Sequence, residues 1–258
     1  MRKTLDFIQT SEFIIFDLEY TAWEGTGARQ WSGQNEHREI IAVGAIKVKS
    51  ESMSLIDELS LLVKPSVNSN LSPYIQELTK ISDREIRERG LSLIEAMHNF
   101  ADFVDGLPVC SYGMDGLVIF ENLLLNEIHA QGHLLQDKID FSLSLAKSGI
   151  IEESPNILPI YGSKAKITKM RARQGVKLTV EIPSVSERPK RRVDFYFYDI
   201  VPWVTTNIPR LTGRSSGELA SCYSDFNVEG QIHDPMFDVK SILFVLKKIS
   251  ENQHIVDA

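Results

Sequence analysis

Cysteine is scarce in this chain. Cys110 and Cys222 are the two cysteines, and neither lies in a C-x-x-C pair or beside a pair of histidines. This spacing argues against a structural zinc site. Two isolated cysteines suit a reducing compartment, and we expect both to be small buried residues.

Long apolar runs are also missing. The runs that occur, such as Phe13 to Phe16 and Ile242 to Leu246, are far shorter than the ~20 residues that a membrane-spanning helix needs. The N-terminal residues Met1 to Asp6 do not lead into an apolar stretch. We therefore expect no signal peptide, no membrane partner and a cytoplasmic location.

A surplus of positive charge is absent from the whole chain but present in one segment. The 258 residues carry a net charge of −7, which by itself argues against a nucleic-acid partner. Residues 164–192 nevertheless hold ten basic and two acidic side chains, so this segment is +8 and the rest is −15. A basic segment on an acidic body favours a polyanionic partner, although a solvated loop without a partner fits the charge equally.

The remaining composition is ordinary. Hydrophobic residues make up 43% of the chain and charged residues 24%, which is typical of one generous globular domain or two small ones. Apolar and alternating patterns predict strands, and capped amphipathic patterns predict helices. The predicted strands are 13–16, 39–48, 55–63, 108–112, 177–182 and 193–200. The predicted helices are 72–78, a short one capped by Asp83, 92–104, 118–130, 141–147, 215–223 and 235–249. This order predicts an α/β domain with a mixed sheet.

Two acids interrupt the most apolar strand. Asp17 and Glu19 are two positions apart, so in a strand they project from the same side. Two buried like charges raise each other's pKa unless a cation lies between them, and hard oxygen ligands suit Mg²⁺ or Mn²⁺. Alone, the pair fits equally well an acid that caps a loop beside a solvated acid.

Acids recur at two later places. Asp115 follows the strand 108–112, where it could also serve as a helix N-cap. His233 and Asp238 flank Pro235, which suits the first turn of a helix. A histidine there can act as a general base near neutral pH, while an acid near a helix N-terminus is favourable without any catalytic role.

The ordered set resembles a known family. Asp-x-Glu on a first strand, an Asp after a later strand, and His-x4-Asp entering a C-terminal helix are typical of the DnaQ-like, or DEDDh, 3′→5′ exonucleases, close to the Eri-type exoribonuclease branch. The segments 63–65 and 71–82 are similar to the family's "V-x-P … L-S-x-x-I-x-x-L-T-G-I", with Lys80 in place of the glycine. The resemblance covers roughly residues 12–130 and 199–250.

The resemblance implies a fold and a reaction. The expected fold is ribonuclease-H-like, with a mixed five-stranded sheet flanked by helices, in a single domain over residues 1–258 with a basic insertion or extension at about 137–198. The family's four metal-binding acids correspond to Asp17, Glu19, Asp115 and Asp238, which would hold two divalent ions, Mg²⁺ or Mn²⁺. His233 would be the general base. The expected substrate is a single-stranded 3′ end, with RNA favoured over DNA and nucleoside 5′-monophosphates as products.

Further residues are candidates for substrate binding. Leu18, Tyr20 and Thr21 follow or lie within the acidic pair and would hold the terminal nucleotide, and Tyr20 or Trp23 could stack on a base, although core packing explains an aromatic equally well. The basic segment could bind backbone phosphates. Its candidate residues are Lys164, Lys166, Lys169, Arg171, Arg173, Arg191 and Arg192.

Three alternatives stay open at this point. The chain could be a non-catalytic nucleic-acid-binding module with an exonuclease fold, an endonuclease of the ribonuclease-H type, or a structural protein whose acids are caps and solvated ends. The sequence assigns neither the sugar preference nor the oligomeric state.

Overall fold

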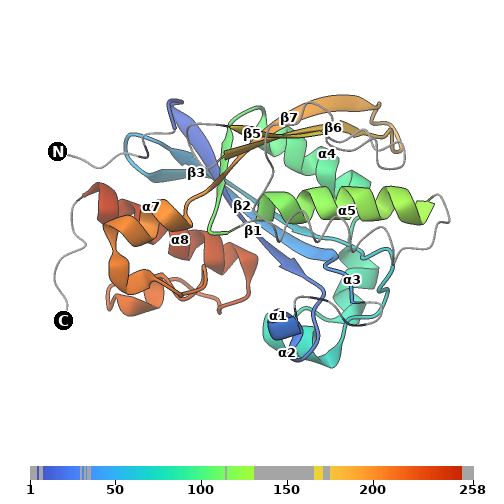
Figure 1. Ribbon diagram of the computed structural model, residues 1–258, viewed down its shortest axis with the longest axis horizontal. Coiled ribbons are helices and arrows are strands. Elements are labelled where there is room, and N and C mark those ends of the chain that lie inside the picture. Colours follow the sequence, from blue (N-terminus) through green and yellow to red (C-terminus); the bar gives the residue numbers. More distant parts are fainter. Residues whose placement is uncertain are drawn as a thin grey trace.

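One mixed sheet runs through the molecule (Figure 1). The computed structural model describes residue 5, residues 8–29, 31, 33, 36–113, 115–130, 166–170 and 175–251. Their strands are β1 (Glu12–Tyr20), β2 (Ile40–Lys49), β3 (Ser54–Leu62), β4 (Pro108–Ser111), β5 (Lys166–Met170), β6 (Gly175–Ile182) and β7 (Arg191–Asp199). They lie in the order β3-β2-β1-β4-β7-β6-β5.

The sheet extends the predicted one. β4 and β7 are parallel to β1, while β2, β3, β5 and β6 join through antiparallel pairs. The predicted mixed α/β architecture is confirmed, and β3-β2-β1-β4-β7 form its five expected strands. β6 and β5 continue the sheet beyond β7, so the described sheet has seven strands. The alternating segment 177–182 is one arm of this extension.

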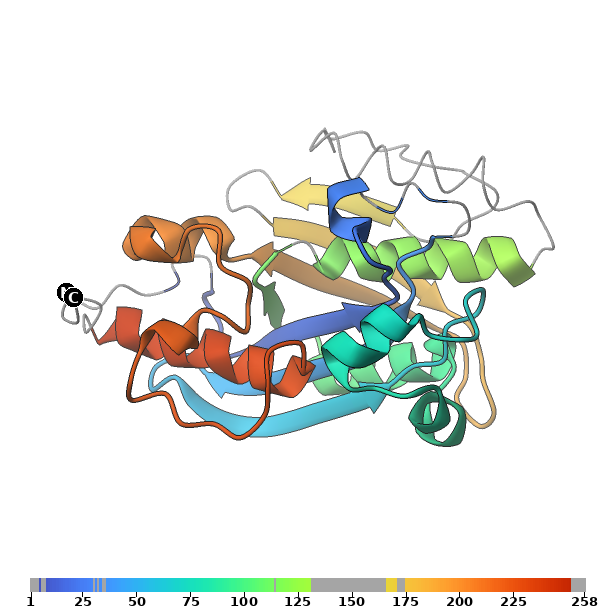
Figure 2. The same cartoon turned by 90° about the horizontal axis from the view of Figure 1, so that it is seen from below.

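Helices cover both faces of the sheet (Figure 2). One face packs against α4 (Leu93–Val104) and α5 (Asp115–Ala130), and the other packs against α7 (Val201–Asn207) and α8 (Pro235–Ser250). The shorter helices are α1 (Thr26–Arg29), α2 (Pro73–Thr79) and α3 (Asp83–Arg89), with 3₁₀ turns η1 (Pro209–Leu211) and η2 (Ala220–Cys222). None of the described helices is long and apolar enough to cross a membrane.

Serine side chains begin three of the helices, as their sequence positions suggest. Ser72, Ser82 and Ser92 accept hydrogen bonds from the third backbone N–H of α2, α3 and α4. The expectation that Asp83 caps α3 is wrong by one residue, because Ser82 is the cap and forms a reciprocal pair with Glu85.

The segment 215–223 differs most from its prediction. It holds turns and the short η2 instead of a helix. Its backbone is bonded to another element: Ser241 of α8 donates to the carbonyl of Ser216 and accepts from the N–H of Ala220. Tertiary hydrogen bonds therefore replace the helical ones that the local pattern predicted.

Part of the predicted insertion lies outside the described residues. The predicted helix 141–147 falls there, and so do Lys164, Arg171 and Arg173. The single-domain boundary of 1–258 and the extent of an insertion over 137–198 therefore stay predictions.

Candidate metal centre and active site

β1 supplies different side chains to the two faces of the sheet. Its residues Ile14, Phe16 and Leu18 pack into the core under α4 and α5. Phe13 and Ile15 pack under α8 on the opposite face. Asp17 and Glu19 continue this second face, and they are only 6% and 7% exposed. The strand alternation thus places two carboxylates at the end of a buried apolar row.

The topology brings the third acid to the same edge. β4 runs parallel to β1, so both strands end at one edge of the sheet, and α5 begins there with Asp115. The prediction of an acid after a later strand is confirmed in position. Burial raises the pKa of Asp115 to about 7, with further contributions from the charges of Glu19 and Asp199.

The fourth acid reaches the site from α8. Asp238 lies in the first turn of this helix and is 2% exposed. Asp234 caps the helix by accepting from the N–H of Met236 at 2.9 Å. The predicted role of Pro235 in the first turn is also confirmed.

Gly44 allows α8 to approach so closely. It pairs with Asp17 across the β1–β2 ladder. A Cβ atom at this position would lie 2.5 Å from the carbonyl carbon of Pro235, which is closer than atoms can approach. The sequence alone gave no sign of this role, because the contact joins residues far apart in the chain.

His233 lies beside Glu19. Its Nδ1 atom is 3.7 Å from Glu19 Oε1, and its backbone has a φ of 70°, which is uncommon outside glycine. The Glu19 carboxylate raises the pKa of His233 above its usual value. One ligand atom each from Glu19, His233 and Asp238 lies within 4.8 Å of the others.

The clustered carboxylates repel one another unless a cation lies among them. Burial is the largest cause that raises the pKa of Asp17, and the charges of Asp115 and Asp238 raise it further. Burial also raises the pKa of Glu19 and raises that of Asp238 to about 7. Among the described residues, the buried Oδ1 atom of Asp238 has no hydrogen-bond partner. Crowded carboxylates with an unpaired buried oxygen fit a hard divalent metal ion.

A cavity of about 500 Å³ opens beside the acids. Asp17, Glu19, Asp115, His233 and Asp238 line one side. The remaining walls include Tyr20, Trp23, Trp31, Tyr74, Ile75, Leu78, Tyr112 and Arg214. This volume lies within the range of small-molecule sites, which combine apolar walls with a few polar groups.

Part of the chain matches a known protein family. Residues 14–110 match the exonuclease family model RNase_T, described as "Exonuclease". Over these residues the chain is similar to exonucleases. No curated protein matches the sequence closely enough to add to this. The matched residues carry the acidic pair of β1 and end with β4, just before Asp115.

Solved structures of 3′-exonucleases share the fold. A full-length 3′-exonuclease is 13% identical, with a TM-score of 0.53 over 94% of this chain and 83% of that one. The nuclease domain of 3′hExo, a DEDDh family member bound to rAMP, is 12% identical, with a TM-score of 0.53 over 96% of both chains. A 3′-exonuclease described as recognising the 3′ end of a histone mRNA stem-loop is also 12% identical, with a TM-score of 0.53 over 94% of this chain and 82% of that one.

The structure places some of the expected nucleotide-binding residues at the cavity and others away from it. Tyr20 and Trp23 line the cavity, and so does Leu18. Because the Leu18 side chain is buried in the opposite core, its main chain is the part available to a ligand. Thr21 does not line the cavity. Its buried hydroxyl donates to the carbonyl of His37 and accepts from the N–H of Glu39 at 2.9 Å, so this side chain closes the loop instead.

An aromatic wall beside Tyr20 was not expected from the sequence. Trp31 meets Tyr20 edge to face, with ring centroids 5.5 Å apart. The guanidinium carbon of Arg38 lies 5.3 Å from the Trp31 ring centroid and 6.0 Å from that of Tyr20. Arg38 is also held by Glu121 at 2.5 Å. A cation over two rings at these distances stabilises their orientation.

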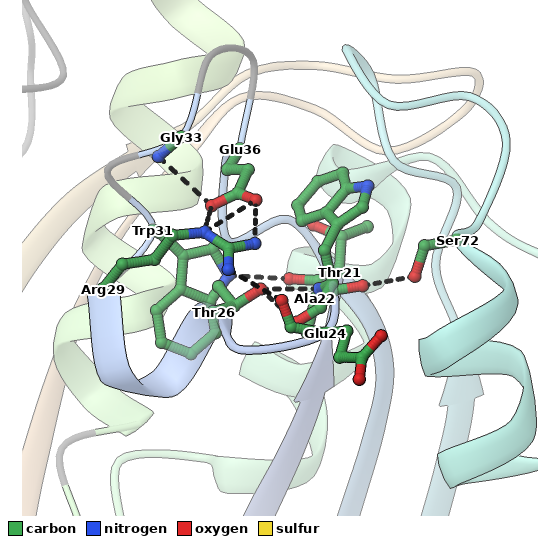
Figure 3. A network of polar contacts seen from close by, with 10 residues as sticks. Thr21, Ala22, Glu24, Thr26, Arg29, Trp31, Gly33, Glu36 and Ser72 are labelled. Carbon is green, nitrogen blue, oxygen red and sulfur yellow. Dashed lines mark hydrogen bonds and ion pairs between the residues drawn. The ribbon is translucent and has the colours of Figure 1, made fainter.

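Polar contacts hold the wall in place (Figure 3). The indole N–H of Trp31 donates to the carbonyl of Thr21 at 2.9 Å, and Arg29 pairs with Glu36 at the turn of the loop. Ser72 of the α2 cap donates to the carbonyl of Ala22. The loop after β1 is therefore tied to itself and to α2.

Arg191 and Arg192, two of the predicted phosphate-binding residues, lie away from the cavity. Arg191 and Arg192 begin β7, whereas the acids lie at the edge where the parallel strands β1, β4 and β7 end. β7 has 9 residues, so its ends are on the order of 25 Å apart at ~3.3 Å per residue. Arg191 is also paired with Asp102 of α4. The structure thus does not bring these two arginines to the site, because the strand direction places them at its far end.

Proposed function

We propose that this chain is a metal-dependent 3′→5′ exonuclease that releases nucleoside 5′-monophosphates from single-stranded nucleic acid. The observation that supports this proposal is that one cavity is lined by Asp17, Glu19, Asp115, Asp238 and His233. These residues come from three separate parts of the chain. A structural role for four clustered acids, three of them buried, would leave their mutual repulsion uncompensated.

The four acids are the proposed ligands of two divalent ions, Mg²⁺ or Mn²⁺. When bound, such a pair stabilises the attacking and leaving oxygens of a phosphodiester displacement. Carboxylate oxygens are the donors that these ions prefer. The unpaired Oδ1 atom of Asp238 and the raised pKa values support this assignment.

His233 is the proposed general base. It lies at the cavity, partly exposed, and its side chain contacts Glu19. A base in this position would accept the proton of the attacking water, and such transfer typically contributes ~10²–10⁴-fold to the rate. Because Glu19 raises the pKa of His233, the neutral form that accepts a proton prevails only at a higher pH than for an ordinary histidine.

The aromatic wall is the proposed site of the terminal base. Tyr20, Trp23 and Trp31 line the cavity on the side of the loop after β1, and Tyr74 of α2 lines another side. Stacking on an aromatic ring contributes ~1–3 kcal/mol per base without sequence preference. Leu18, between Asp17 and Glu19, also lines the cavity, where its main chain is available to a ligand.

RNA is the favoured substrate class. The relatives described as bound to rAMP and as recognising a histone mRNA stem-loop support it. Contacts with the ribose 2′-hydroxyl would decide this preference. A cytoplasmic location stays an expectation from the sequence.

The basic segment is proposed to bind phosphates near one end of the sheet. Met170 and Gly175 pair with each other, and Gly175 also pairs with Tyr198 near the end of β7. This end of the β5–β6 hairpin therefore lies at the same edge of the sheet as the acids. Lys169 precedes Met170 in β5, and we propose that it binds phosphate at this end of the sheet. Lys166 begins β5 at the other end of the hairpin, opposite Thr179. It remains a predicted contact, as do Lys164, Arg171 and Arg173.

Oligonucleotides labelled at the 5′ end test the proposed activity. RNA and DNA strands, with a free or a blocked 3′ hydroxyl, are incubated with the protein and Mg²⁺ or Mn²⁺. The expected result is a ladder that shortens from the 3′ end, faster on RNA, and that disappears when the 3′ end is blocked or the metal is chelated. Internal cuts in the blocked strand would indicate an endonuclease, and binding without any cleavage would indicate a non-catalytic module; either result contradicts the proposal.

A further inference from the structure

Ser216 lies against one of the acids proposed above as metal ligands. Its hydroxyl donates to Asp238 Oδ2 at 3.0 Å. A hydroxyl has one proton to donate, and the described geometry directs it to Asp238. Ser216 and Asp238 both line the cavity beside Asp17 of β1.

The segment around Ser216 is built onto α8. Ser241 lies in the same helix as Asp238, one turn further on, and it is fully buried. Its hydroxyl donates to the carbonyl of Ser216 at 2.8 Å and accepts from the N–H of Ala220 at 3.0 Å. Both hydrogen-bonding functions of this buried hydroxyl are therefore used to fix the backbone that carries Ser216.

Gly217 completes the fit to Asp238. A Cβ atom at this position would lie 2.3 Å from Asp238 Oδ1 and 2.9 Å from a methyl carbon of Ile232. Any larger residue would push the carboxylate out of place. Ser216 therefore holds one oxygen of Asp238, and Gly217 leaves room for the other, which has no hydrogen-bond partner among the described residues.

We propose that Ser216, fixed by Ser241, is a positioning residue that sets the orientation of the Asp238 carboxylate for divalent metal binding. The inference rests on the proposed metal-dependent function. Groups that hydrogen-bond to metal ligands fix their orientation, and their loss typically lowers metal affinity ~10–100-fold. A hydroxyl that merely filled space would not affect metal affinity in this way.

Mn²⁺ binding to the purified full chain tests this role. Free Mn²⁺ is followed by electron paramagnetic resonance during titration of wild type, Ser216→Ala, Ser216→Thr and Ser221→Ala. Ser221 is an exposed serine of η2 whose hydroxyl donates to the carbonyl of Glu218, so it is the matched control. The unfolding temperature of each metal-free variant is measured in parallel.

The expected result is a ~10–100-fold higher dissociation constant for Ser216→Ala, with the metal-free unfolding temperature retained. Ser216→Thr, which keeps a hydroxyl, should bind Mn²⁺ nearly as wild type does, and Ser221→Ala should be unchanged. Equal affinity of Ser216→Ala and wild type would overturn the inference. If Ser216→Ala does not fold, Ser216→Thr decides: wild-type affinity supports the role of the hydroxyl, and a loss of affinity overturns it.

Ser241→Ala gives a second measurement. This variant should weaken Mn²⁺ binding in the same direction, and the double variant should lose less than the product of the two single losses, because both act through the same carboxylate. Independent, multiplicative effects would overturn the link between the two serines. A wild-type protein that binds no Mn²⁺ would instead contradict the proposed function itself, and with it this inference.

Discussion

The two faces of β1 have opposite effects on the stability of the fold, although they share one backbone. On one face, Ile14, Phe16 and Leu18 are buried among apolar side chains. On the other, the row that begins with Phe13 and Ile15 ends with two buried carboxylates. The first face lowers the free energy of the fold by burying apolar surface. The second places like charges where their repulsion opposes folding.

This contrast shows how the apolar face supports the charged one. Phe16 packs against Phe100 and Phe197 with ring centroids 5.5 and 5.4 Å away, so the strand is fixed immediately beside Asp17. Rigid neighbours hold the carboxylates close together when they would otherwise separate. Strained or unfavourable groups of this kind persist where the surrounding structure determines them.

Asp17→Asn gives the sharpest break between the faces. It keeps the shape of the side chain and removes a buried charge, so we expect exonuclease activity to fall to the background of the assay. The metal-free protein should become more stable, because a charge that burial and neighbouring acids disfavour is gone. Hydrolysis of a labelled strand and unfolding in urea with a chelator measure the two effects. Undiminished activity, or a large loss of stability, would show that Asp17 is structural.

His233→Gln separates proton transfer from metal binding within the charged face. We expect the turnover rate to fall by ~10²–10⁴-fold, while Mn²⁺ affinity is less affected than in Asp17→Asn. Turnover under saturating substrate and Mn²⁺ titration measure the two quantities. If Mn²⁺ affinity fell as far as in Asp17→Asn with an equal loss of turnover, His233 would be a ligand rather than the base.

Phe16→Ala tests the apolar face. Phe16 is fully buried, so its truncation should cost ~3–5 kcal/mol of unfolding free energy. The matched control is Leu55→Ala on the exposed side of β3, where Leu55 is 42% exposed, and its effect should stay within about ±0.5 kcal/mol. Urea unfolding at one pH measures both. A similar small effect for the two variants would contradict the packing described for this face.

The pH dependence of stability tests the burial of Asp238. The pKa of Asp238 is raised from 3.8 to about 7 in the folded protein. A raised pKa stabilises the fold below the unfolded value, and this stability is lost as pH rises toward the folded value. Relative to Asp238→Asn, metal-free wild type should therefore lose stability between about pH 4 and pH 7.

Unfolding of both proteins across this pH range, with a chelator present, gives the difference directly. Excess Mn²⁺ should remove much of the loss in wild type, because a bound cation favours the ionised carboxylate. A difference between the two proteins that is constant with pH would mean that Asp238 titrates normally.

Much of the site was predictable from the sequence, because its residues sit in local patterns. The alternation of β1 placed Asp17 and Glu19 on one side, and Pro235 marked the start of the helix that carries Asp238. The ordered set then carried the resemblance to the DnaQ-like exonucleases. These features depend on short-range geometry that a strand or a helix start fixes by itself.

The rest depends on contacts between distant segments. Gly44 matters because α8 crosses β2, and Ser216 matters because Ser241 draws its segment onto α8. The local pattern of 215–223 suggested a helix for the same reason: its hydrogen bonds to α8 are invisible in the sequence. The direction of β7 likewise decided that Arg192 lies far from the acids, which charge counting could not show.

Lys80 shows the structural consequence of a residue that departs from the family's sequence pattern. It stands where the family commonly has glycine, at the C-cap of α2, with a φ of 61°. That left-handed conformation costs an L-residue ~1–2 kcal/mol. The usual glycine is therefore explained by the turn, and the lysine is a local strain that the fold tolerates.

Anomalous diffraction from crystals soaked with Mn²⁺ and a nucleoside 5′-monophosphate tests the central claim most directly. The charged face of β1 predicts Mn²⁺ peaks between the carboxylates of Asp17, Glu19, Asp115 and Asp238, with the nucleotide in the adjoining cavity against Tyr20. Peaks bound elsewhere, or none at this edge of the sheet with the metal in excess, would contradict the account.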